Sequence, residues 1–176
     1  MAGSAAFFSQ YPVLMQKVFN ISPGISSMVF AVTAGLGLIL YPAAGKWSSV
    51  YGSDQVIKSA FGIRWIAYLF LFVLGVIHLK YSNWLALIAF AFVVCSWSII
   101  IVGGTALAAQ LSPVGEGESL GLFNAFNALA GVIGASLGGW VAGLWGYKFI
   151  ALVAILGIGL GLLLIFLIPV NQAKEK

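Results

Sequence analysis

Charged side chains are scarce in this 176-residue sequence, in which only 7% of the residues are Asp, Glu, Lys or Arg. Soluble globular chains carry about 25%. Because 62% of the residues are hydrophobic and the mean hydropathy is +1.10, this shortage excludes an ordinary soluble domain. Most of the surface must face lipid, where backbone polar groups have to bond internally, so only helices or a closed barrel are possible.

The sequence also lacks the pattern of a barrel, whose strands alternate lipid-facing and lumen-facing side chains. Residues 150–168, IALVAILGIGLGLLLIFLI, show no such alternation. A helical span needs about 20 mostly apolar residues, and on that criterion we predict an all-α, polytopic membrane protein with six transmembrane helices. Residues 1–170 form one bundle and residues 171–176 a polar tail. The predicted spans are 2–19, 23–44, 60–79, 83–111, 119–144 and 147–169.

Residues that carry catalysis or bind metals are few. Cys95 is the only cysteine and His78 the only histidine, which excludes an internal disulfide or a haem held by two histidines and argues against a metal cluster. There is no Ser/His/Asp set and no phosphate-binding loop, so we predict no enzymatic activity, no metal and no cofactor. Proton-coupled transporters need a titratable group in the membrane, but all four acidic residues fall in predicted loops or the tail. They are Asp54, Glu116, Glu118 and Glu175.

The net charge of +4 is interpreted as a membrane-orientation signal and not as a nucleic-acid site, since no basic stripe interleaved with aromatic residues is present. Six spans place both termini on one side of the membrane. Five basic residues on that side against three on the other predict that both termini are cytoplasmic. The first set is Lys46, Lys58, Arg64, Lys174 and Lys176, and the second is Lys17, Lys80 and Lys148.

The predicted loop 45–64 has the spacing of a family signature. Gly45 and Gly52 match the two glycines of the loop between the second and third helices of each half of the major facilitator superfamily. Ser49 stands where that family prefers Asp, and Ser53 and Asp54 stand where it prefers Arg or Lys. The resemblance implies a conformational loop, in which Asp54 and Lys58, four residues apart, can pair. Its residues are Gly45, Lys46, Gly52, Asp54, Lys58 and Arg64.

Two further stretches extend the resemblance over nearly the whole chain. Residues 111–147 resemble the loop and glycine-rich helix eleven of the family, and residues 7–23 resemble the end of helix seven with its short outer loop. The chain is therefore similar to the C-terminal six-helix half of such a transporter. Complete members have twelve helices in two halves, so the resemblance leaves open a fragment, a reduced gene product, or a chain that works by pairing.

Polar side chains inside spans are costly and usually face the protein interior or a wet cavity. The resemblance implies that the first, second, fourth and fifth helices line the path, whereas the third and sixth face lipid. The central parts of the third and sixth predicted spans are nearly free of polar residues, and this agrees with a position facing lipid. Structural hydrogen bonding is an equal alternative for the amides. The candidates for a substrate path are Gln10, Tyr11, Trp97, Asn124 and Asn127.

Glycines in the fifth span form two pairs with the small-xxx-small spacing that lets helix backbones approach in lipid. The first pair is Gly134 and Gly138, and the second is Gly139 and Gly143. We predict that they serve packing within the bundle, and the alternative is a surface that slides against a second half.

Two functions follow from these patterns. The first is a transporter-type domain: half of a facilitator that works with a second half to move a small organic solute. The uncharged aromatic and amide side chains in the spans suit a neutral solute. The second is a non-transporting accessory or structural subunit of a larger membrane complex. The expected partners are the lipid bilayer and a second copy or another membrane chain, and no nucleic acid.

Overall fold

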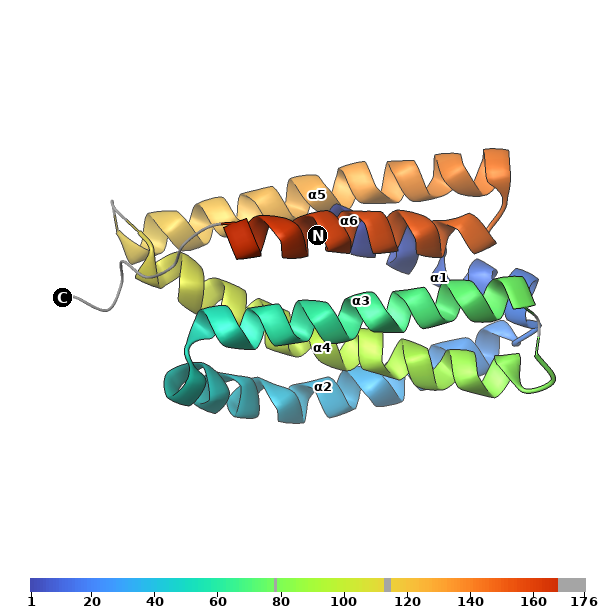
Figure 1. Cartoon of the computed structure of the whole chain (residues 1–176), viewed down its shortest axis with the longest axis horizontal. Coiled ribbons are helices and arrows are strands. Elements are labelled where there is room, and N and C mark those ends of the chain that lie inside the picture. Colours follow the sequence, from blue (N-terminus) through green and yellow to red (C-terminus); the bar gives the residue numbers. More distant parts are fainter. Residues whose placement is uncertain (78, 113–114, 168–176) are drawn as a thin grey trace.

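The computed structural model describes residues 1–77, 79–112 and 115–167, except the side chain of residue 116. Over these ranges the regular structure is entirely helical, which confirms the all-α prediction (Figure 1). Five of the helices are long and apolar enough to cross a membrane, and α1 is not among them. The elements are α1 (Ala2–Phe19), α2 (Pro23–Tyr51), α3 (Ser53–Ile77), α4 (Ser82–Gln110), α5 (Glu116–Trp145) and α6 (Lys148–Leu167).

The prediction that residues 45–64 form a loop is wrong. Helix α2 continues to Tyr51 and α3 starts at Ser53, so Gly52 is the single non-helical residue between them. Hydropathy falls where a helix leaves the membrane, although the helix itself can continue into water until a residue breaks it. The Asp54–Lys58 pair forms on the first turns of α3, with 3.5 Å between Lys58 Nζ and Asp54 Oδ2.

Gly52 can make this corner because its φ of +88° and ψ of 139° lie where side chains are strained. We expect Gly52→Ala to lower the free energy of unfolding by about 1–3 kcal/mol. Gly45 is the matched control, because it lies inside α2 with open space around an added Cβ. Gly45→Ala should raise the free energy by about 0.5–1 kcal/mol, since alanine favours helix. Unfolding by SDS in mixed micelles measures both, and equal effects would contradict the assignment of the corner to Gly52.

The helices alternate in direction, so their connections gather at the two ends of the bundle. Figure 1 shows the α2–α3 and α4–α5 connections at one end and the other three connections at the opposite end, with the N-terminus midway along the bundle. Gly3, near the start of α1, accordingly lies against Ala154 in the middle of α6.

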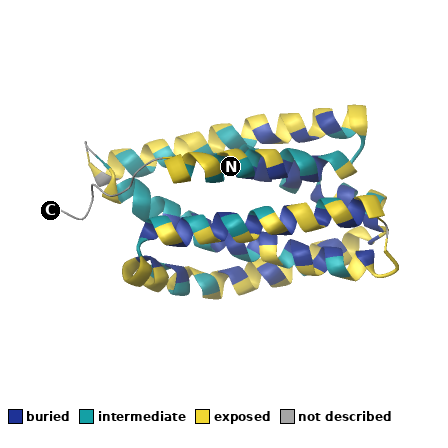
Figure 2. Cartoon of the chain, viewed as in Figure 1, coloured by how far each residue is buried: buried dark blue, intermediate teal, exposed yellow. Residues whose placement is uncertain are grey.

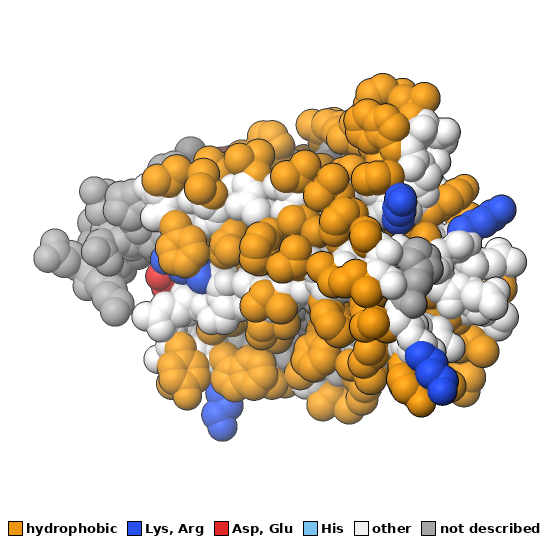
Figure 3. All heavy atoms as spheres, turned by 45° about the vertical axis from the view of Figure 1, so that its right-hand side comes forward, with side chains coloured by type: hydrophobic (Ala, Val, Ile, Leu, Met, Phe, Trp, Pro, Cys, Tyr) orange, Lys and Arg blue, Asp and Glu red, His pale blue; other side chains and the backbone are white. Residues whose placement is uncertain are grey.

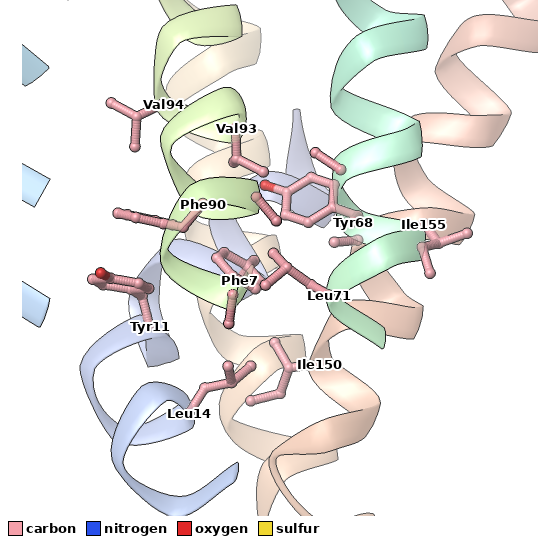
Figure 4. Close-up of a cluster of buried hydrophobic side chains, with 14 of the residues drawn as sticks. Phe7, Tyr11, Leu14, Tyr68, Leu71, Phe90, Val93, Val94, Ile150 and Ile155 are labelled. Atoms are coloured by element: carbon pink, nitrogen blue, oxygen red, sulfur yellow. The ribbon is translucent and has the colours of Figure 1, made fainter. Parts of the chain in front are cut away.

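The core lies where α1, α3, α4 and α6 meet, and its centre is aromatic (Figure 4). The Phe7 and Tyr68 rings are 4.9 Å apart between centroids, and Tyr11 stacks on Phe90 at 3.7 Å with 10° between the ring planes. Stacked and tilted pairs of this kind add about 0.5–1.5 kcal/mol each beyond burial of their area. Helix α3 packs between α4 and α6, and much of its surface is buried (Figure 2).

Close approach of α5 to α1 depends on one of the two predicted glycine pairs. A Cβ at Gly134 would collide with the carbonyl oxygen of Ala2, and a Cβ at Gly138 with the backbone of Ala6. Packing within the bundle is therefore the role of this pair. A Cβ at Gly139 would have only the side-chain amide of Gln10 nearby, at 3.8 Å, and a Cβ at Gly143 would lie in open space. The prediction that Gly143 serves packing within the bundle is therefore wrong.

The outer surface is that of a membrane protein. In Figure 3 basic side chains lie toward the two ends of the visible face, and the band between them is mostly hydrophobic. Helices α2 and α5 are the least buried of the five candidate spans. Large apolar side chains on them are widely exposed, among them Met28, Leu38 and Ile39 on α2 and Phe126 and Val132 on α5.

Candidate functional site

A cavity of about 540 Å³ opens between four helices. Its volume falls in the usual range of small-molecule sites, roughly 300–1,000 Å³. The wall is mostly apolar and aromatic, with a few polar groups from serine, asparagine, tyrosine and tryptophan. The lining residues belong to α1 and its cap (Met1, Ser4, Ala5, Phe8), α2 (Phe30, Ala34, Leu38, Tyr41), α4 (Val94, Trp97, Ser98) and α5 (Asn127, Gly131).

Two of the five candidate path residues lie on this cavity. Trp97 and Asn127 both line it and are half-buried. Asn124, one turn before Asn127 on α5, is exposed and is not part of the lining. Side chains three residues apart in a helix point in somewhat different directions. This difference places the amide of Asn127 in the cavity lining and that of Asn124 outside it.

Tyr11 and Gln10 lie elsewhere. The Tyr11 ring is buried in the core, and its hydroxyl donates to the backbone oxygen of Ser26 at 3.1 Å. It therefore fixes α1 to the start of α2. Gln10 is half-buried on the side of α1 that faces Gly139 of α5. Neither residue is part of the cavity lining.

Arg64 is the residue whose position sequence reasoning assigned wrongly. The prediction that it is a loop charge is wrong, because it lies in the middle of α3 with no exposed surface. Its Nη2 donates to the backbone oxygen of Val93 on α4 at 2.7 Å. Its guanidinium carbon is 5.1 Å from the centroid of the Trp97 ring and 5.8 Å from that of Phe8. Both rings line the cavity, so the charge stands directly behind its wall.

The sequence does contain a pattern that places Arg64 on the buried face of α3. If α3 is started immediately after Gly52, buried residues recur along one stripe at Val56, Ala60, Arg64, Tyr68 and Leu71. The spacing of three and four residues is that of one helix face, which puts the arginine on the core side. Without Arg64, the side with the termini holds four basic residues against three. The cytoplasmic placement of the termini stays a prediction on that smaller margin.

The lining comes from α1, α2, α4 and α5, while α3 and α6 contribute no residue to it. The lining helices are those that the family resemblance implies. Helix α3, which the resemblance places toward lipid, packs between α4 and α6 and carries a buried charge at its centre. A family model described as Major Facilitator Superfamily matches residues 1–176. The chain belongs to the major facilitator superfamily. It is accordingly an integral membrane transporter domain. A search among curated proteins found no match.

Within this superfamily domain, the cavity wall offers groups that can bind a small molecule. Among the described residues there is no group of three or more His, Cys, Asp or Glu that could hold a metal ion. Its polar groups can orient a solute by hydrogen bonds, and its aromatic rings can hold an apolar body. Such a surface fits recognition of a small amphipathic molecule.

Proposed function

We propose that this chain is one half of a facilitator that moves a small organic solute through the cavity between α1, α2, α4 and α5, working with a second half. The observation that supports this most is the exposure of the cavity wall on α2. Phe30 is 41% exposed, Leu38 69% and Tyr41 36%, although all three line the cavity. A solute there would meet lipid on one side unless another protein surface completes the site.

The exposed amide of Asn124 supports the same arrangement. It lies eight residues into the apolar helix α5, and an amide without a partner in hydrocarbon costs several kcal/mol. A second half over α2 and α5 would supply hydrogen-bond partners for Asn124 and close the cavity that Asn127 lines. In secondary transporters the binding site lies between two such repeats, and transport is a rocking of one against the other.

Cysteine cross-linking in native membranes tests the covering surface. In a Cys95→Ala background, which removes the single native cysteine, we expect Asn127→Cys to form a cross-linked species with a second chain. Leu160→Cys is the matched control, because Leu160 is 60% exposed on α6, away from the cavity. It should react with lipid-soluble labels and give no cross-linked species.

The opposite pattern would remove the support for transport with a second half. If Asn127→Cys is labelled from lipid as readily as Leu160→Cys and never cross-links, the cavity is a lipid-facing groove of a monomer. If cross-linking succeeds but vesicles that hold the cross-linkable complex take up no solute, the accessory-subunit function replaces transport. Uptake into proteoliposomes, compared with vesicles that lack protein, is therefore the second measurement.

A further inference from the structure

Buried hydrogen-bond donors without acceptors cluster behind the cavity wall. Among the described residues, seven buried side-chain polar atoms have no hydrogen-bond partner, and four of them belong to Ser4, Arg64 and Tyr68. They are Ser4 Oγ, Arg64 Nε, Arg64 Nη1 and the Tyr68 hydroxyl. Buried polar groups in native proteins are nearly always bonded. The hydroxyls of Ser4 and Tyr68 lie close enough to pair with each other, so the donors that lack an acceptor are Nε and Nη1 of Arg64, and they indicate a missing acceptor beside the guanidinium.

The three residues come from two helices and meet at one point. Ser4 is on α1, and Arg64 and Tyr68 are one turn apart on α3. The Tyr68 hydroxyl lies beside Ser4 and interacts electrostatically with Arg64, without a well-formed hydrogen bond to either. All three side chains are at most 1% exposed, so bulk water does not satisfy them from outside.

The chemistry of this cluster is that of an anion site. A guanidinium offers donors and no acceptor, and the two hydroxyls can also donate. The ion pair found in the described part of the chain joins Asp54 to Lys58, and it leaves the charge of Arg64 without a counter-ion there. A carboxylate accepts through both oxygens and matches the guanidinium fork. It is the group that would satisfy the most orphaned donors at once.

The cluster is also connected to the cavity. Ser4 itself lines it. The Trp97 and Phe8 rings, which line it as well, are the layer between the guanidinium of Arg64 and the open space. For a group in the cavity to reach the guanidinium of Arg64, one of these rings has to turn aside, and the cation–π contact of that ring with Arg64 opposes the turn.

We propose that the solute of this cavity is a monocarboxylate with an apolar or aromatic body. The carboxylate binds Arg64 and the hydroxyls of Tyr68 and Ser4, while the body lies against Phe8 and Trp97. This inference rests on the proposed function, because it names the solute class for the same cavity. It also replaces the neutral solute expected from composition, since that expectation treated Arg64 as a loop residue.

Equilibrium binding of two matched probes to the full chain in lipid nanodiscs tests the proposal. The probes are 2-naphthoate and its neutral isostere 2-naphthamide, which differ in charge and hardly in shape. We expect the native chain to bind the carboxylate at least about tenfold more tightly than the amide, as a charge-assisted bidentate pair should. Arg64→Gln should bring the ratio close to one and leave amide affinity nearly unchanged.

Three further variants keep the result interpretable. Lys58→Gln removes an equal charge that lies outside the cavity lining, and it should leave the tenfold ratio intact. Arg64→Lys keeps the charge but loses the fork, so the ratio should fall only in part. Tyr68→Phe removes one donor and should lower the ratio about threefold, which gives a readout even if Arg64→Gln does not fold.

Equal binding of the two probes to the native chain would overturn the carboxylate site, and the cavity would remain a path for neutral solutes. Binding of neither probe would also overturn it, and the proposed function would then depend on the cross-linking and uptake measurements alone. A preference for naphthoate that survives Arg64→Gln would equally place the anion site elsewhere.

Discussion

Replacing Gly138 with leucine should separate α5 from α1 and lower the free energy of unfolding by at least about 3 kcal/mol, because a bulky group would be forced into a closed contact. A Cβ at Gly138 would lie 2.9 Å from the Cα of Ala6 and close to its carbonyl oxygen. The obstacle is backbone of a fully buried residue, so it cannot turn aside as a flexible side chain could. SDS-induced unfolding in mixed micelles gives the free energy, and size-exclusion chromatography shows whether the bundle stays compact.

The same helix supplies the control. Gly143 has open space around an added Cβ, so Gly143→Leu should not destabilise the chain and should raise the free energy of unfolding by about 0.5–1 kcal/mol, since leucine favours helix over glycine. Equal destabilisation by the two leucines would mean that insertion into the membrane dominates. A stable Gly138→Leu chain would mean that α1 and α5 do not touch where the structure places them.

Replacing Arg64 with methionine should raise the free energy of unfolding by about 1–3 kcal/mol, even though it removes a hydrogen bond. A buried charge without a counter-ion carries a desolvation cost of about several kcal/mol, and an apolar side chain of similar size avoids this cost. The Val93 carbonyl that Arg64 binds would keep a partner, because Ser96 Oγ also donates to it at 2.9 Å. Unfolding in mixed micelles, in the absence of any carboxylate, measures the change.

The companion variant is Arg64→Lys, which retains the buried charge and should leave the free energy unchanged or lower. Proteins retain costly groups where function needs them, so greater stability together with lost carboxylate preference is the expected signature. A lower free energy for Arg64→Met would show instead that the contacts of the guanidinium with Val93, Phe8 and Trp97 hold the fold together.

The boundary between α2 and α3 shows how far hydropathy can define an element. The apolar run of α2 fades near residue 44, yet the helix continues to Tyr51. Lys46 and Ser49 are compatible with helix, and the Ser49 hydroxyl donates to the Lys46 carbonyl oxygen at 2.8 Å. Hydropathy records where lipid ends, whereas helix ends depend on backbone conformation. Only Gly52 has the conformation that stops the helix here.

The glycine pairs show a similar division. Their spacing along α5 correctly predicts close helix packing at Gly134 and Gly138. The same spacing at Gly139 and Gly143 leads to little or no contact, because the two pairs point in different directions and α1 lies on one of them. Spacing defines which residues share a face, but not which face meets a neighbour.

The sequence by itself determined that most of the surface faces lipid, that the chain is helical and that it has six segments. It also determined which polar residues lie within those segments. Scarcity of charge and the rule that backbone groups bond internally in lipid are sufficient for this. Tertiary structure decided that Trp97 and Asn127 line the cavity, that Tyr11 is in the core, and that Arg64 stands behind the wall. In a membrane the lipid-facing and core-facing sides of a helix are equally apolar, so hydropathy cannot orient it about its axis. The orientation of a helix about its axis is set by close contacts, such as that of Gly138 with Ala6 and that of Arg64 with Val93.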